Sequence, residues 1–338
     1  MPGAAAICKD RKGNQNIFPA RDRSHPSGPT PPPVLQCGGS FTTEKPGKEV
    51  SEQVRGIRCC AKNIFFSGSG LVGLILLLAL AAPASAGSGI VVFAGSASQP
   101  PLEEAAGKFH EMTGTRVALH FGGSGAMLNQ ARLTGQGDLY IPGSPDYMEK
   151  ARELGVVEDE RSIIAYLVPA IIVEKGNPQK IAGLRDLERE GLRVGLADPD
   201  GVCVGLYAVE ILEANGMLDS IRPNLRGMVE SCAKAAAMIP LSLVDAVLGW
   251  REFAAWNPQS MEAVLLAPDE IPRLAYIPAA VLRHAQNRPG AERFITFLES
   301  DEGQAIFRKW GYVTKESAAR KFAPGARIGG SYTLPEGL

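Results

Sequence analysis

The sequence predicts an α/β fold of two lobes, each a mainly parallel sheet flanked by helices, with a hinge between them. Short apolar runs alternate with amphipathic, helix-like runs, which is the pattern of a parallel sheet. The alternation occurs twice, on either side of a long apolar stretch at residues 163–173. With 338 residues, 45% of them hydrophobic and 21% charged, the chain can fill the cores of two lobes.

The segment that precedes the lobes does not have a globular composition. Residues 1–54 are rich in Pro, Gly, Ser and Lys and show no apolar period, so they cannot bury enough surface to order themselves. We therefore expect residues 1–66 to be a disordered or wrongly assigned extension, with a true translation start near residue 54.

Residues 67–86 are typical of a secretory signal peptide. The apolar run 71–82 is too short for a membrane span, follows basic residues and precedes the small-residue sequence Ala84-Ser85-Ala86. Cleavage there would give a periplasmic or secreted chain that begins at Gly87 and has no stable membrane insertion. The alternative is that the run is retained as a membrane anchor.

The first lobe is predicted over residues 87–167, and the chain returns to it at residues 273–316. Its expected elements are strand 90–93, helix 102–112, strand 116–121, helix 126–133, strand 139–142, helix 147–154, strand 274–277 and helices 291–298 and 303–310. Residues 317–338 are expected to form a Gly/Pro-rich tail.

The second lobe is predicted over residues 168–272. The apolar stretch 163–173, interrupted by Pro169, is expected to form one or two strands that cross into it. The elements that follow are strand 192–197, helix 205–215, helix 232–239 and strand 244–248. Two lobes joined by more than one crossing enclose a cleft that a ligand can close.

Two turns in the first lobe predict an anion site. Ser96 and Ser124 each lie in a small-residue turn that leads from an apolar strand into a helix. Such a turn leaves unpaired backbone N–H groups at the positive end of the helix dipole. Both turns should meet at the carboxyl edge of one sheet, where open α/β folds bind ligands. The alternative role of each serine is ordinary helix capping.

The cysteines divide between the extension and the lobes. Only Cys203 and Cys232 follow the predicted cleavage site, and two thiols in an oxidising compartment suggest one disulfide. Two buried free cysteines are the alternative.

Six segments in order resemble the periplasmic molybdate-binding proteins of bacterial molybdate ABC importers, which are type II extracellular solute-binding proteins. The resemblance runs over residues 90–313 and rests on VFAGSAS, FGGSGAML, GDLYIPGSPDYM, ADPDGVCVGLYA, VDAVLGW and FITFLESDEGQAIFRKWGY. It implies the two-lobed periplasmic binding protein fold, a non-enzymatic role and a tetrahedral oxyanion, molybdate or tungstate first, held between the lobes. The implied partners are this anion and an ABC permease, and we expect a monomer without cofactors.

The resemblance also assigns the residues of the site. It implies that Ser96 and Ser124 donate hydroxyls and that Val204 and either Cys232 or Ala233 donate backbone N–H groups. Trp250 stands where the family often has a tyrosine, and an indole N–H can donate but cannot accept. No cationic metal is implied.

Charged residues near the predicted site mean that other anions are alternative ligands. A guanidinium from Arg251 would favour bidentate binding of an oxyanion or a carboxylate. A carboxylate from Asp198, Asp200 or Asp245 would suit phosphate, which keeps a proton near neutral pH. Turn and cap chemistry is the alternative role of Asp198 and Asp200, and a strand-edge position that of Asp245. Sulfate, phosphate and small carboxylates are therefore alternative ligands, and a membrane-anchored sensor ectodomain is the alternative role.

Other function classes find little support in the sequence. The net charge of −1 provides no field that would attract nucleic acid. The turn at Ser124 lacks the G-x-S-x-G spacing of a hydrolase, because Ala126 fills the last place. A hydrolase would also need a base near Ser124, and His110, His120 and His284 are the histidines that follow the cleavage site. No Cys or His spacing indicates zinc.

Overall fold

The computed structural model describes residues 7–9, 15–17, 89–158 and 162–335, and the chain divides into two units, Met1–Gly70 and Leu71–Leu338. In the first unit, strands β1 (Ile7–Lys9) and β2 (Gln15–Ile17) pair antiparallel, where the composition predicts a disordered extension. The predicted signal peptide lies outside the described residues, and so does the alternative anchor.

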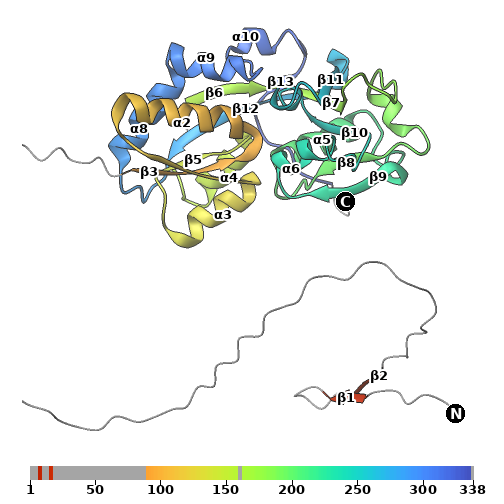
Figure 1. The fold of residues 1–338 in the computed structure, drawn as a ribbon, viewed down its shortest axis with the longest axis horizontal. Coiled ribbons are helices and arrows are strands. Elements are labelled where there is room, and N and C mark those ends of the chain that lie inside the picture. Colours follow the sequence, from red (N-terminus) through yellow and green to blue (C-terminus); the bar gives the residue numbers. More distant parts are fainter. Residues whose placement is uncertain (1–6, 10–14, 18–88, 159–161, 336–338) are drawn as a thin grey trace, which may run out of the picture. The chain divides into compact units, whose positions relative to one another are not determined.

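The first lobe of the second unit is built on a mixed sheet in the order β13-β12-β5-β3-β4, with β6 beside β12 (Figure 1). Its strands are β3 (Ile90–Gly95), β4 (Val117–Gly122), β5 (Leu139–Ile141), β6 (Ser162–Leu167), β12 (Arg273–Val281) and β13 (Arg327–Ile328). Strand β3 runs parallel to β4 and β5, whereas β12 runs antiparallel to β5 and β6.

Helices cover this sheet. They are α2 (Gln99–Thr113), α3 (Ser124–Thr134), α4 (Pro145–Glu153), α8 (Arg288–Glu299), α9 (Asp301–Lys309) and α10 (Glu316–Ala319). Helix α2 has prolines in its first turn and ends at Gly114, whose φ of 72° is left-handed. Helix α2 begins at Gln99, just before the prolines expected near its first position, and α3 begins two residues before the predicted start at 126, because Ser124 and Gly125 carry no apolar period.

The second lobe is built on a five-stranded sheet in the order β11-β7-β10-β8-β9. Its strands are β7 (Pro169–Glu174), β8 (Val194–Ala197), β9 (Leu225–Val229), β10 (Ala246–Trp250) and β11 (Met261–Leu265), and its helices are α5 (Cys203–Ala214), α6 (Cys232–Ala237) and α7 (Phe253–Trp256). The second lobe also contains three short 3-10 helices, η3 (Leu184–Glu188), η4 (Arg222–Asn224) and η5 (Pro268–Glu270). A fourth, η2 (Ser96–Ser98), lies in the first lobe. The sequence did not predict β9 and β11.

The fold is the predicted two-lobed α/β arrangement (Figure 1). Strand β6 ends in the first sheet at Leu167, and β7 begins in the second sheet at Pro169, so the apolar stretch forms two strands. One hydrophobic cluster continues from the first sheet to Val202, Tyr207 and Trp250 of the second lobe. The lobes therefore pack directly against each other.

Arg273 of β12 ties both lobes to the tail. Its guanidinium is fully buried and contacts Asp146 of α4 at 2.8 Å and Glu210 of α5 at 2.7 Å. It also donates to the carbonyl of Gly330 at 2.6 Å and lies 4.0 Å from the ring centre of Tyr207. The predicted tail is thus part of the packed structure, paired with β12 through β13.

Across residues 89–158 and 162–335, the helices are too short or too polar to cross a bilayer.

Candidate functional site

The two predicted serines lie at one edge of the first sheet. Ser96 follows β3 directly, and Ser124 begins α3 two residues after β4. The two strands are parallel neighbours, with Gly95 paired to Gly122, so both turns leave the sheet at the same level. Both serines are almost fully buried, with exposed fractions of 2% and 1%.

Neither serine side chain caps its own helix, because the cap positions of η2 and α3 are Gly95 and Gly123. The Ser124 hydroxyl oxygen instead accepts from the N–H of Gly143 at 3.0 Å. A side chain at Gly95 would lie 2.7 Å from both the Ser124 oxygen and the Gly143 nitrogen. The glycine therefore allows the turn to approach Ser124 closely.

The second lobe contributes the starts of two helices. Cys203 and Val204 begin α5, and Cys232 and Ala233 begin α6. The N–H of Ala233 donates to the hydroxyl oxygen of Ser96 at 3.1 Å, across the lobe boundary. The backbone N–H of Val204 lies near the Cys232 thiol and lowers its pKa slightly against the larger effect of burial. The structure thus brings the predicted donors of both lobes to one place.

The lobes are closed over this place. The N–H of Gly125 donates to the carbonyl of Gly201 at 3.0 Å, and the two residues belong to different lobes. A side chain at Gly123 would lie 2.7 Å from the carbonyl oxygen of Glu230. Opening of the cleft must break the Gly125–Gly201 bond and the Ala233–Ser96 bond.

Two thiols lie within this junction. The Sγ atoms of Cys203 and Cys232 are 3.5 Å apart and buried, and both residues are free thiols in the structure. Burial raises the pKa of the Cys232 thiol well above its usual value, and the adjacent Cys203 thiol raises it further. Cys232 is therefore a neutral donor at neutral pH, and the disulfide stays a prediction.

Trp250 closes the second lobe's side of the junction. It is fully buried, and its ring packs edge-on against Tyr207 at 5.1 Å. Its indole N–H has no hydrogen-bond partner among the described residues, but it lies near enough to the Cys232 thiol to lower that group's pKa slightly against the larger effect of burial. The hydroxyl of Tyr207 is also buried without such a partner in that part of the chain. Both groups are buried donors without a hydrogen-bond partner in that part of the chain, and the indole of Trp250 lies near the Cys232 thiol.

The charged residues that could have favoured a different class of anion interact with other residues of the protein instead. Arg251 contacts Glu252 at 3.1 Å and donates to the carbonyl of Gly311. Asp198 accepts the N–H of Asp200 at 3.0 Å, which is turn chemistry. Asp245 pairs with Arg193 at 2.7 Å.

His120 and His284 contact residues outside the proposed site. His120 is exposed, with its ring 5.3 Å from that of Phe93, and His284 bonds to the carbonyl of Gln136. The Ser124 oxygen is hydrogen-bonded to a backbone amide, not to an imidazole.

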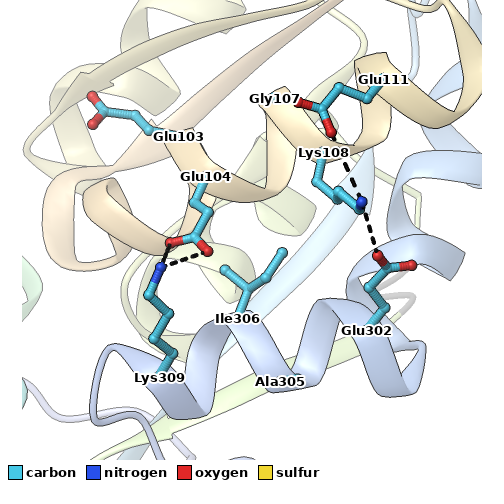
Figure 2. Close-up of a pocket in the computed structure, with 9 residues that line it drawn as sticks. All are labelled: Glu103, Glu104, Gly107, Lys108, Glu111, Glu302, Ala305, Ile306 and Lys309. Carbon is cyan, nitrogen blue, oxygen red and sulfur yellow. Dashed lines mark hydrogen bonds and ion pairs between the residues drawn. The ribbon is translucent and has the colours of Figure 1, made fainter.

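A cavity of about 470 Å³ lies on another part of the first lobe, between α2 and α9 (Figure 2). Glu104 pairs there with Lys309 at 2.9 Å, and Lys108 pairs with Glu302 at 3.5 Å. The hydrogen bond from Lys309 lowers the pKa of Glu104. None of the residues predicted to hold the anion lines this cavity, and its lining carries four carboxylates against two lysines, which does not favour an anion.

Sequence reasoning missed Gly143, Tyr207 and the place of Cys203 beside the serines. A side chain at Gly143 would lie 2.5 Å from the Cys203 sulfur, so the two residues touch across the lobe boundary. The GSP sequence at Gly143 and the CVGLY sequence after Val202 were visible as turn and helix signals, but their contact was not.

Similar proteins agree with the fold. The chain is 24% identical over 230 residues to a putative binding protein of Haemophilus influenzae, covering 66% of this chain and 90% of that protein. It is 25% identical over 254 residues to the molybdate-binding protein ModA of Rhodobacter capsulatus, covering 73% and 96%.

Two solved structures share the fold. The periplasmic molybdate-binding protein of Azotobacter vinelandii superposes with a TM-score of 0.58 at 19% identity, covering 67% of this chain and all of that chain. The sulfate-binding protein SubI of Mycobacterium tuberculosis gives a TM-score of 0.61 at 16% identity, covering 71% and 93%.

The family model for bacterial extracellular solute-binding proteins matches residues 90–313, the same range over which the six motifs resemble such proteins. The predicted resemblance is thereby confirmed, and with it a role in binding and not in catalysis. The chain belongs to the family of bacterial extracellular solute-binding proteins.

Proposed function

We propose that this protein captures a small tetrahedral oxyanion, with molybdate or tungstate as first candidates, and delivers it to the permease of an ABC importer. Support comes from the family, from relatives named molybdate-binding proteins and from a donor-rich junction between two lobes. The protein would act as a monomer in the periplasm, after cleavage behind Ala86.

The hydrogen bond across the lobes carries this proposal. The oxygens of Ser96 and Ser124 accept from the N–H groups of Ala233 and Gly143, so each hydroxyl keeps its own proton to donate. Both protons lie at the edge where the helix starts of the second lobe arrive. An anion that enters on opening would take the place of the Ala233–Ser96 contact and receive donors from both lobes.

The proposed ligand set consists of donors. It comprises the hydroxyls of Ser96 and Ser124, the backbone N–H groups of Val204, Cys232 and Ala233, and the indole N–H of Trp250. Molybdate, tungstate and sulfate carry no proton near neutral pH, so such a set suits them. Phosphate would need an acceptor, and the nearby Asp198 and Asp245 already have partners.

The proposed ligand set carries no positively charged side chain, which favours release of the anion. Arg251, the candidate guanidinium, is held by Glu252 and Gly311. An anion held by neutral donors avoids the strong attraction of a buried ion pair, so lobe opening at a permease can free it.

A Ser96→Ala, Ser124→Ala double variant tests the ligand set. Hydrogen bonds to charged groups contribute about 1.5–3 kcal/mol each, so molybdate affinity should fall by at least about 100-fold. Thermal shift and calorimetric titration with molybdate, tungstate, sulfate, phosphate and small carboxylates measure this. Ser98→Ala is the matched control, because that buried hydroxyl bonds only to the carbonyl of Gly95 at 3.3 Å among the described residues. Unchanged affinity in the double variant would refute the proposed site.

Sulfate is the second candidate ligand. Trp250 is bulkier than the tyrosine that the family often has there, and a bulkier side chain leaves less room for the larger molybdate. Competition between sulfate and molybdate on the same sample decides between them. Mass measurement of the mature protein separates a released binding protein from a tethered sensor, because cleavage after Ala86 removes the tether.

A further inference from the structure

The thiols of Cys203 and Cys232 form a pair inside the proposed anion site. Their sulfurs are 3.5 Å apart, and each residue is the first of a helix. Their exposed fractions are 1% and 2%, so both are sealed from solvent in the closed form.

Each cysteine adjoins a residue whose backbone N–H binds one of the two serine hydroxyls. Cys203 lies against Gly143, whose N–H holds the Ser124 oxygen. Cys232 precedes Ala233, whose N–H holds the Ser96 oxygen. The two cysteines are thus linked to both serine hydroxyls through neighbouring residues, Gly143 and Ala233.

An unpartnered donor aims at the same place. The buried indole N–H of Trp250 has no oxygen or nitrogen partner in the described part of the chain and lies beside the Cys232 sulfur. A buried donor without a partner costs about 1–3 kcal/mol, so a ligand that accepts from it would recover that cost. The thiol pair and this donor therefore belong to one site.

We infer that Cys203 and Cys232 form an oxidisable dithiol. An external disulfide, either a small molecule or a protein, oxidises the pair to a Cys203–Cys232 disulfide. The anion binds the reduced form of the protein. The coupling to the anion rests on the proposed function, whereas the oxidation of the pair does not.

The chemistry is a thiol–disulfide exchange. One cysteine, as thiolate, attacks a sulfur of the external disulfide, forms a mixed disulfide and expels one thiolate. The other cysteine then attacks the protein sulfur of that mixed disulfide and expels the second thiolate. The two protons of the cysteines pass to the two leaving groups, and the external disulfide takes up two electrons.

Oxidation should weaken anion binding for two reasons. A disulfide has no S–H, so the junction loses two weak donors that adjoin the proposed ligand set. The sulfurs also move from 3.5 Å to about 2.05 Å apart, which displaces the helix starts that carry Val204 and Ala233.

The coupling also works in the other direction. An external disulfide can reach the thiols only after the Ala233–Ser96 and Gly125–Gly201 bonds have broken. An anion that holds the lobes closed should therefore protect both thiols from oxidation and alkylation.

The experiment uses the secreted protein with molybdate as probe. Alkylation followed by peptide mapping reads each cysteine separately, with and without molybdate, after treatment with dithiothreitol or oxidised glutathione. We expect a Cys203–Cys232 cross-linked peptide after oxidation and at least a tenfold loss of molybdate affinity that reductant restores. At about 100 times Kd, molybdate should slow alkylation of both thiols about 100-fold.

A Cys203→Ser, Cys232→Ser double variant is the control. Its molybdate affinity, whatever its value, should be the same before and after oxidised glutathione. No cross-linked peptide under oxidation, or equal molybdate affinity of the cross-linked and reduced forms, would overturn the inference.

The two proposals fail in different ways. If the reduced protein binds none of the anions, the proposed function and the coupling are both wrong, while the cross-linked peptide still reports on the dithiol. If the reduced and cross-linked forms bind molybdate equally, the proposed function stands and only this inference is lost.

Discussion

The two lobes bring different chemistry to the edge at which they meet. The first lobe offers glycines and two serines, Ser96 and Ser124, whose hydroxyl oxygens each accept a hydrogen bond from a backbone amide. The second lobe offers larger groups, two thiols and an indole, and two of its polar atoms, on Trp250 and Tyr207, have no partner among the described residues. The first edge therefore sets the geometry of the site, whereas the second provides its adaptable donors.

The first test compares how much room an added methyl group has on each edge. A side chain at Gly143 of the first lobe would lie 2.5 Å from the Cys203 sulfur and 2.8 Å from the Cβ of Ala97. Gly143→Ala should therefore destabilise the closed protein by about 1–3 kcal/mol, as overpacked cores do. At Gly201 of the second lobe the nearest atom would be 3.6 Å away, so Gly201→Ala is the matched control.

Urea unfolding of both variants measures the effect. Equal unfolding free energies for Gly143→Ala and Gly201→Ala would show that the first-lobe edge can accommodate an added methyl group. The two edges would then not differ in rigidity.

The second test concerns the buried carboxyl behind the junction. Burial raises the pKa of Glu252 to about 7, against the opposing charge of Arg251. The folded state thus holds a proton that the unfolded state releases near pH 4.5, so this group makes stability fall as pH rises from about 4.5 to 7. The contribution is up to about 3 kcal/mol.

Glu252→Gln should flatten that slope, because the amide cannot titrate. Unfolding of the wild type and the variant at about pH 5 and about pH 7.5 checks this. A variant that keeps the full wild-type slope would place the titrating group elsewhere.

The third test addresses the unused donor of the second lobe. Trp250→Phe removes the indole N–H and keeps an aromatic ring against Tyr207. If the N–H binds the anion, molybdate affinity should fall about tenfold, which corresponds to about 1.4 kcal/mol. Trp256→Phe is the control, because its indole N–H bonds to the Tyr312 hydroxyl at 3.2 Å. Equal affinities in both variants would remove the Trp250 indole from the proposed ligand set.

The same contrast explains how much the sequence could predict. The first edge is encoded locally, since small residues at Ser96 and Ser124 follow strong apolar strands and precede helices. The two-lobed fold and the meeting of these two turns followed from that pattern, whereas the helix starts at Val204 and at Cys232 or Ala233 came from the family resemblance. Strand β9 was missed because its exposed residues carry no apolar alternation.

Contacts between distant segments were beyond a local pattern. Neither the approach of Cys203 to Gly143 nor the full burial of Arg273 shows in the residues around them. Arg251 could equally have entered the cleft, and only the positions of Glu252 and Gly311 show that it does not.

The buried guanidinium of Arg273 has a practical consequence for where the protein can be cut. The family match ends at residue 313, but the carbonyl of Gly330 lies beyond that point and accepts from this side chain. A shortened protein that ends at residue 313 would remove one hydrogen-bond acceptor of the buried Arg273 guanidinium. It would also remove strand β13, which pairs with β12. Useful boundaries for production must therefore follow the hydrogen bonds and extend past residue 330.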